Sequence, residues 1–243
     1  MERGMSAPME ARTTAIEALI FDMDGLLVDS EPLADASMVE FLRRHGRQAR
    51  EEYAPQLLGR RLPDAVALFI EWYGLEGQLE DLTAEFDALR TEMITGNLAL
   101  MPGAREIISF GRDAGLRLGL ATSNRRHQAV LSLAETGLTG RFDAEVTGDD
   151  VSRGKPFPEI FLTAARLLGV DPVHCVVLED APAGVMAATA AEMRCIFVPN
   201  GYSLLGTVPV APAVTVTTLI EAIGWLREQG VGRDADVSPE FER

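Results

Sequence analysis

Several features that would place a chain in a specialised class of protein are missing from this sequence of 243 residues. Two cysteines and three histidines are too few to indicate a disulfide framework or a zinc site. Cys175 and Cys195 both lie in apolar runs, where we expect small buried side chains. No apolar run approaches the roughly 20 residues that cross a bilayer, and residues 1–15 lack the apolar stretch of a secretory signal. We therefore expect a cytoplasmic protein with a disordered leader over residues 1–15 and no membrane partner.

Positive charge is also scarce. Lys and Arg number 22 against 37 Asp and Glu, which gives a net charge of −15. Nucleic-acid binders need a basic surface, so we expect no DNA or RNA partner, and we expect a monomer. Lysine is the scarcest of all: Lys155 stands alone among 21 arginines. Because an ammonium is a compact point charge and a guanidinium a planar fork, a lone lysine suits a tight site around a small anion.

Most of the chain alternates short apolar runs with helical patterns. Strand–helix alternation of this kind predicts a doubly wound, parallel α/β sheet with a Rossmann-like arrangement, covered by helices on both faces. Prolines and small polar residues precede the expected helices, as is typical of helix starts. The expected strands are 18–22, 116–122, 142–146, 174–180, 194–199 and 213–216, and the expected helices between them are 103–114, 125–136, 158–168 and 182–191.

One long segment interrupts this alternation. Between the first and second expected strands, residues 33–45, 63–73 and 79–95 carry apolar side chains at helical spacing. We expect residues 32–99 to form an inserted helical domain, whose stripe Val66, Phe69, Ile70 and Tyr73 belongs to its own core. The α/β core would then comprise residues 16–31 and 100–228, followed by a polar tail over 229–243.

Residues with chemical function follow the expected strands. Ligands of such sheets bind at the carboxyl ends of the strands, so these residues should meet at one edge. Close carboxylates repel one another unless a cation lies among them, and oxygen ligands without His or Cys favour Mg²⁺ over zinc. With a lysine and a hydroxyl nearby, they indicate a phosphate pocket in which an aspartate attacks as nucleophile. The residues are Asp22, Asp24, Thr122, Ser123, Asn124, Lys155, Glu179 and Asp180.

Four segments carry a family resemblance. They are FDMDGLLVDSEP (21–32), ATSN (121–124), GKPFPEIF (154–161) and LEDAPAGVMAA (178–188). In order and wording they resemble the four motifs of the haloacid dehalogenase-like superfamily, and in particular its phosphatase subgroup around β-phosphoglucomutase, which has a helical cap after the first motif. The resemblance implies a Mg²⁺-dependent phosphatase of a small phosphorylated metabolite, such as a sugar phosphate or a nucleoside monophosphate.

The resemblance also implies which residues would act on the phosphate. Asp22 would be the nucleophile that takes the phosphoryl group. Asp24 would protonate the leaving alcohol and then activate water, while its backbone carbonyl would bind Mg²⁺. Lys155 would bridge the nucleophile and the phosphate. Dehalogenation, the other reaction of the superfamily, has no leaving alcohol to protonate and uses no metal. The presence of Asp24 and of the acidic pair Glu179 and Asp180 therefore favours phosphoryl transfer.

The remaining motif residues would hold the phosphate and the metal. By the same resemblance, Thr122 and the amide of Ser123 would hold the phosphoryl oxygens. Asn124 would either contact the phosphate or cap the following helix. Asp180 would bind Mg²⁺ directly, with Glu179 in support.

The expected cap gives less information about the substrate. Gly59, Arg60 and Arg61 lie where the family presents a loop over the active site, and they are candidate substrate-binding residues. In β-phosphoglucomutase, the arginine three residues after the loop glycine looks to hold the second phosphate of the substrate. The corresponding residue of this chain is Leu62. This difference favours a phosphatase and leaves a phosphosugar mutase as the alternative. A non-catalytic binding protein would be expected to have lost one of the motif residues, and all are present.

Overall fold

A computed structural model describes residues 15–50, 53, 56–57, 60–202 and 208–232. The leader expected over residues 1–15 lies outside them except for residue 15, and the expected tail lies outside them beyond residue 232. Within the described ranges, every helix is too short or too polar to span a bilayer.

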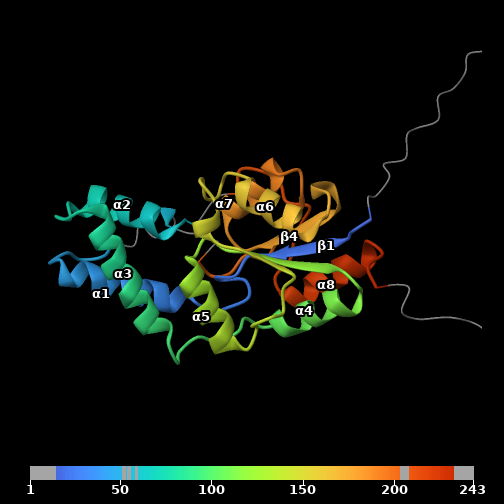
Figure 1. The fold of residues 1–243 in the computed structure, drawn as a ribbon, viewed down its shortest axis with the longest axis horizontal. Coiled ribbons are helices and arrows are strands. Elements are labelled where there is room, and N and C mark those ends of the chain that lie inside the picture. Colours follow the sequence, from blue (N-terminus) through green and yellow to red (C-terminus); the bar gives the residue numbers. More distant parts are fainter. Residues whose placement is uncertain (1–14, 51–52, 54–55, 58–59, 203–207, 233–243) are drawn as a thin grey trace, which may run out of the picture.

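A six-stranded parallel sheet forms the centre of the molecule (Figure 1). Each of the six predicted runs contains one of its strands, and the predicted doubly wound fold is confirmed. The strand order is β3-β2-β1-β4-β5-β6, so the order reverses beside β1, where ligands of this fold bind. The strands are β1 (Ala18–Phe21), β2 (Arg117–Ala121), β3 (Ala144–Val146), β4 (Cys175–Glu179), β5 (Arg194–Phe197) and β6 (Val214–Thr215).

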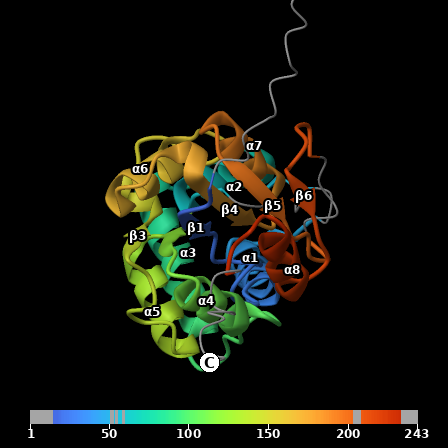
Figure 2. The same cartoon turned by 90° about the vertical axis from the view of Figure 1, so that its right-hand side faces the viewer.

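Helices cover both faces of this sheet because its strands are apolar on both sides. In β1, Leu19 and Phe21 pack on one face, whereas Ala18 and Ile20 pack on the other. Figure 1 shows α6 and α7 on one side of the sheet and α4, α5 and α8 on the opposite side. Figure 2 views the end of the molecule with β6 and α8. The covering helices are α4 (Ala104–Asp113), α5 (Arg126–Thr136), α6 (Glu159–Leu168), α7 (Pro182–Ala190) and α8 (Leu219–Glu228), with two short 3-10 helices at η2 (Gly148–Asp150) and η3 (Pro172–His174).

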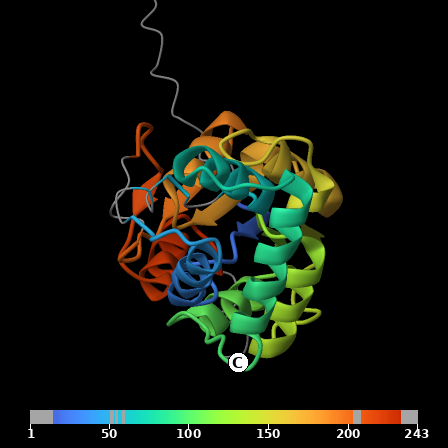
Figure 3. The same cartoon turned by 90° about the vertical axis from the view of Figure 1, so that its left-hand side faces the viewer.

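Three further helices, α1 (Glu31–Arg44), α2 (Leu62–Tyr73) and α3 (Leu79–Ile94), lie beyond the carboxyl ends of the strands (Figures 1 and 3). We call them the helical layer. They enclose a hydrophobic cluster of their own, in which Val66, Phe69 and Tyr73 are buried and Ile70 is packed against them, as the sequence pattern predicts. The prolines in the first turns of α1 and α2 are compatible with helix starts, where the missing N–H has no helical partner.

The chain leaves the sheet and returns to it at one place. The backbone N–H of Asp29 donates to the carbonyl of Ala99 at 2.9 Å, and Val28 forms an antiparallel bridge with Leu100. The helical layer is therefore joined to the sheet by two adjacent segments. The boundary expected at residues 31/32 and 99/100 remains a prediction, although both connections lie there.

Candidate active site

The loop after β1 carries two aspartates at the centre of the sheet edge. The backbone N–H of Asp22 donates to the carbonyl of Leu178, which continues the pairing of β1 with β4. Gly25 closes the loop with φ of +74°, and a Cβ there would overlap the carboxylate of Asp180. The glycine thus allows the β1 loop to lie against the end of β4.

Lys155 lies buried among carboxylates, with 6% of its surface exposed. Its Nζ donates to Oδ1 of Asp22 at 2.6 Å and also to Oε1 of Glu179. Burial alone would lower the pKa of Lys155, but the attraction of these two carboxylates raises it above its ordinary value. The ammonium is therefore held in its charged form, and it fixes the orientation of the Asp22 carboxylate.

A buried cluster of three carboxylates surrounds this lysine. One oxygen from each of Asp22, Glu179 and Asp180 lies within 4.8 Å of the others. Burial, together with the repulsion from Glu179 and Asp22, raises the pKa of Asp180 well above its ordinary value. Burial, opposed by Lys155, likewise raises the pKa of Asp22. One ammonium does not balance three carboxylates, so the cluster has the charge and the oxygen donors that suit a divalent cation.

The rest of the cluster is tightly fixed. Oε2 of Glu179 accepts the backbone N–H of Ala181 at 2.9 Å, and a Cβ on Gly184 would overlap the same carboxylate. Asp180 accepts the side-chain amide of Asn200 at 2.9 Å, and that amide also donates to the carbonyl of Gly25 at 3.1 Å. The acidic pair is thus positioned by the start of α7 and by a residue after β5.

Asp24 is held by three side chains. Its Oδ1 accepts the hydroxyl of Ser30 at 2.8 Å, and its Oδ2 accepts the amide of Asn124 at 2.8 Å and the hydroxyl of Thr122 at 3.4 Å. Thr122 and Asn124 are buried at the carboxyl end of β2. The predicted motif residues of β1 and β2 therefore meet.

An open cavity lies between the sheet edge and the helical layer. Asp22, Asp24, Ser123, Asn124 and Asp180 line it on the side of the sheet. The helical layer contributes the apolar side chains of Met38, Leu62, Phe69 and Phe86, the acidic Asp35 and the basic Arg90, and Arg60 lines the cavity from just before α2. A cavity lined by polar groups of the sheet edge and by apolar side chains of the helical layer is typical of a site for a small molecule.

Glu31 also lines this cavity, at the start of α1. Burial, with added repulsion from Asp24 and Asp35 and opposed by Arg90, raises its pKa to about 7. Near neutral pH this carboxyl group is therefore partly protonated and can donate a hydrogen bond as well as accept one.

The three predicted residues of the cap loop have different positions. Gly59 lies outside the described residues. Arg60 lines the cavity, with its Nε donating to the carbonyl of Gln56. Arg61 instead pairs with Asp64 at 3.0 Å, and its Nη1 donates to the carbonyls at positions 151 and 152, at 3.2 and 3.1 Å. Arg61 thus joins the start of α2 to the loop between η2 and α6, and its expected contact with substrate remains a prediction.

Sequence reasoning did not find three residues of this site: Ser30, Asn200 and Arg90. Ser30 lies inside the first motif and could have been recognised there. Asn200 and Arg90 stand outside every motif, and their sequence surroundings carry no signal of function. Only the folded chain brings Asn200 to Asp180, and Arg90 to Asn124 at 3.4 Å.

The chain is similar to a known protein family and to several phosphatases. A family model described as haloacid dehalogenase-like hydrolase matches residues 16–192. Hexitol phosphatase B of Escherichia coli strain K12 is 36% identical over 199 residues, which are 80% of this chain and 86% of that protein. A phosphorylated carbohydrates phosphatase of Thermotoga maritima is 32% identical over 182 residues, 75% of this chain and 84% of its own.

Among solved structures, β-phosphoglucomutase from Clostridium difficile superposes with a TM-score of 0.77. The alignment covers 88% of this chain and 96% of that one, at 22% sequence identity. At this identity, the likeness supports the fold and not a particular activity.

Proposed function

This chain belongs to the haloacid dehalogenase-like hydrolases, as its four motifs predict, and on that premise we propose a Mg²⁺-dependent phosphatase that acts through a phosphorylated Asp22. The substrate would be a small phosphorylated metabolite. The observation that carries the proposal is the contact of Lys155 with Asp22 and Glu179, inside a buried carboxylate cluster of which Asp22 and Asp180 line the cavity. In such a site, the cation lies next to the anionic nucleophile and reduces its repulsion from an anionic phosphate ester.

The chemistry requires such compensation of charge. A phosphate monoester and Asp22 are both anionic, and the uncatalysed hydrolysis is among the slowest reactions known. Lys155 would attract the phosphoryl group and shield it from the carboxylate that attacks it. Because the ammonium holds Oδ1 of Asp22 at 2.6 Å, the nucleophile is already oriented before the substrate arrives.

The donor set fits a magnesium ion. Asp22, Asp180 and the backbone carbonyl of Asp24 would hold the ion, with Glu179 in support, and oxygen donors of this kind are those that Mg²⁺ prefers. When bound, the ion neutralises charge on the phosphoryl oxygens. It would also keep the buried carboxylates ionised, against the effect of burial on the pKa values of Asp22 and Asp180.

Asp24 would move the protons. In the first step an oxygen of Asp22 forms a bond to phosphorus, the ester P–O bond breaks, and its electron pair leaves on the alcohol oxygen, which takes a proton from Asp24. In the second step a water molecule gives a proton to Asp24 and attacks the phosphorus, which releases phosphate and restores the Asp22 carboxylate. Thr122 and the amide of Ser123 would hold the phosphoryl oxygens in both steps.

The cavity favours a polar metabolite with one phosphate. Glu31 and Arg60 line the cavity and would offer hydrogen bonds to hydroxyl groups of a substrate, and Phe69 and Phe86 contribute apolar surface to its lining. The names of the relatives from E. coli and T. maritima point to phosphorylated hexitols and carbohydrates, which is the substrate class we propose first. Nucleoside monophosphates remain a second class, because the apolar side chains of the helical layer could contact a base.

A phosphosugar mutase is the alternative within the same chemistry. A mutase must hold a second phosphate, and Arg60, just before α2, is a cation that lines the cavity. Leu62, which lines the same cavity, cannot hold an anion, and this favours the phosphatase.

The test is a phosphate-release screen of the purified protein over hexitol, hexose, pentose and nucleoside phosphates. We expect release with Mg²⁺, loss of activity in a chelator, and no rescue by Ca²⁺, whose looser coordination would misplace the nucleophile. A mutase would release little phosphate and would convert a hexose 1-phosphate to the 6-phosphate when primed with a bisphosphate. Full activity in a chelator, or no turnover of any ester, would contradict the proposal.

A further inference from the structure

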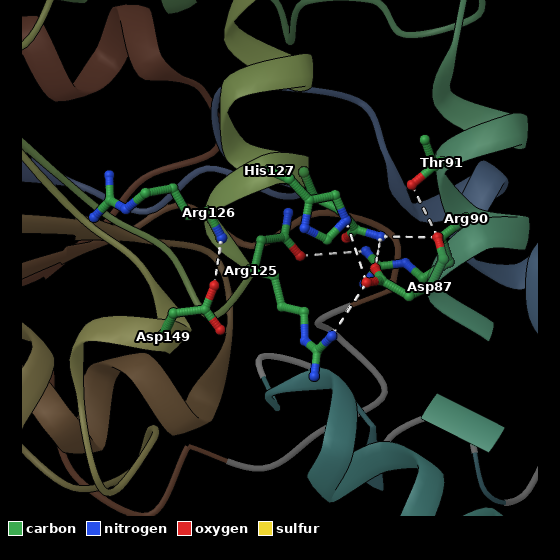
Figure 4. A network of polar contacts seen from close by, with 9 residues as sticks. Asp87, Arg90, Thr91, Arg125, Arg126, His127 and Asp149 are labelled. Atoms are coloured by element: carbon green, nitrogen blue, oxygen red, sulfur yellow. Dashed lines mark hydrogen bonds and ion pairs between the residues drawn. The ribbon is translucent and has the colours of Figure 1, made fainter. Parts of the chain in front are cut away.

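Polar contacts also join α3 of the helical layer to the start of α5, one of the helices that cover the sheet (Figure 4). The buried carboxylate of Asp87 on α3 accepts a hydrogen bond from Nε2 of Gln128 at 2.6 Å. It also faces Nε2 of His127 at 3.2 Å and Nη1 of Arg125 at 3.4 Å. All three partners lie in or next to the first turn of α5, where the helix dipole also favours a negative charge. Asp87 therefore fixes α3 against the loop that carries Thr122 and Asn124.

Arg90 stands one helical turn after Asp87, on the same side of α3, and lines the cavity. Its Nη2 donates to Oδ1 of Asn124 at 3.4 Å. Nδ2 of the same amide donates to Oδ2 of Asp24 at 2.8 Å. Asn124 thus lies between a cation of the helical layer and the carboxylate of Asp24.

An amide group has one accepting end and one donating end, so only one of its two orientations satisfies both neighbours. With the amide turned over, its oxygen would face the Asp24 carboxylate and its NH₂ group would face the guanidinium. Asn124 is 5% exposed, so water offers it few alternative partners. Asp24 and Arg90 therefore favour the same orientation, and Arg90 holds the oxygen end of the amide while its NH₂ group donates to Asp24.

We propose that Arg90 is a positioning residue that acts through Asn124 to hold the Asp24 carboxylate in place for proton transfer. This inference rests on the proposed function, in which Asp24 protonates the leaving alcohol. It also follows that Asp24 is fully positioned only while α3 is docked on α5. A direct contact of Arg90 with the substrate is the competing explanation, because the same guanidinium lines the cavity.

The two explanations differ in a double-mutant cycle. We would measure kcat and KM of the full-length protein with Mg²⁺ for the wild type, Arg90→Met, Asn124→Ala and the double variant, on the best substrate of the screen. Arg90→Met should lower kcat about 10-fold with little change in KM, and should have no further effect in the Asn124→Ala protein. A rise in KM, or losses that multiply in the double variant, would mean that Arg90 contacts the substrate and would overturn the proposal.

A comparison of leaving groups adds a readout that a purely structural effect would not change. An alkyl phosphate needs a proton on its leaving oxygen, whereas p-nitrophenyl phosphate leaves without one. Arg90→Met should therefore lower kcat/KM for the alkyl ester much more than for the aryl ester. Equal losses for both esters would contradict a role through Asp24.

Two controls complete the experiment. Arg166→Met removes an exposed arginine from the last turn of α6 and should behave as wild type. If Arg90→Met fails to fold, Arg90→Ala, which also removes the donor to Asn124 and has a smaller side chain, should give the same pattern. An inactive wild type would overturn the proposed function and this inference with it, whereas an active wild type with multiplying losses would overturn this inference alone.

Discussion

At the scale of single residues, the two cations Lys155 and Arg90 differ in how well their roles can be predicted from the sequence. Lys155 is the only lysine of the chain and stands in a recognisable motif, so its chemistry can be predicted before its position is known. Arg90 is one of 21 arginines, and no neighbour in the sequence distinguishes it. The function of a rare residue in a motif can be predicted from the sequence, but the function of a common residue outside any motif can be inferred only from its contacts in the structure.

Lys155→Arg tests whether the site requires an ammonium or only a positive charge. The guanidinium is planar and larger, so it cannot occupy the point between Asp22 and Glu179 that the buried Nζ occupies. We expect kcat to fall about 100-fold or more, the scale of losing one donor to the transition state. Steady-state kinetics with circular dichroism as a check of folding would measure it. A variant with wild-type kinetics would show that Lys155 is not part of the phosphate site.

At the scale of secondary-structure elements, short apolar runs predict the strands well because burial on both faces requires apolar residues along the whole strand. All six strands lie where the runs place them, and the ends of β1, β2 and β4 bring the motif residues together. The contact between α3 and α5 leaves no such local trace. Asp87 and Gln128 are 41 residues apart, and each alone resembles an ordinary polar residue of a helix. Contacts of this kind require the packed structure.

Helix α7 can pack closely against the site because Gly184 has no side chain. Gly184 lies in its first turn, and a Cβ there would overlap the carboxylate of Glu179, which is fully buried and bonded to Lys155 and to the N–H of Ala181. Glu179 therefore cannot move aside without releasing Lys155. The close packing of α7 on β4 and the position of Lys155 depend on the same glycine.

We accordingly expect Gly184→Ala to impair both folding and activity. The overlap should lower the free energy of unfolding by about 2 kcal/mol, within the range for overpacked cores, and should reduce kcat at least about 10-fold. Gly224→Ala in α8 is the matched control, because a Cβ there meets no atom within 4 Å. That change should leave kcat unaltered and should stabilise the helix by about 0.5–1 kcal/mol. Denaturant unfolding and kinetics of both variants would measure the difference, and equal behaviour would contradict the account.

At the scale of the whole molecule, the fold separates two tasks. The sheet edge holds a fixed set of charges, which the four motifs encode, and the helical layer encloses the cavity with side chains outside those motifs. A protein with a net charge of −15 must provide local positive charge wherever it binds an anion. Arg60 and Arg90 line the cavity, and Lys155 lies behind its lining, bonded to Asp22. The reaction class is therefore easier to predict than the substrate.

The central claim is that Asp22 is the nucleophile, and the kinetics of Asp22→Asn test it most directly. The amide nearly preserves the shape of the carboxylate but cannot attack phosphorus, so kcat for the best substrate of the screen should fall at least about 1,000-fold with Mg²⁺ present. The control Asp113→Asn changes an exposed aspartate at the end of α4 and should keep wild-type activity. If Asp22→Asn retained more than a tenth of the wild-type kcat, with deamidation excluded by peptide mass measurement, another group would be the nucleophile and the account would be wrong.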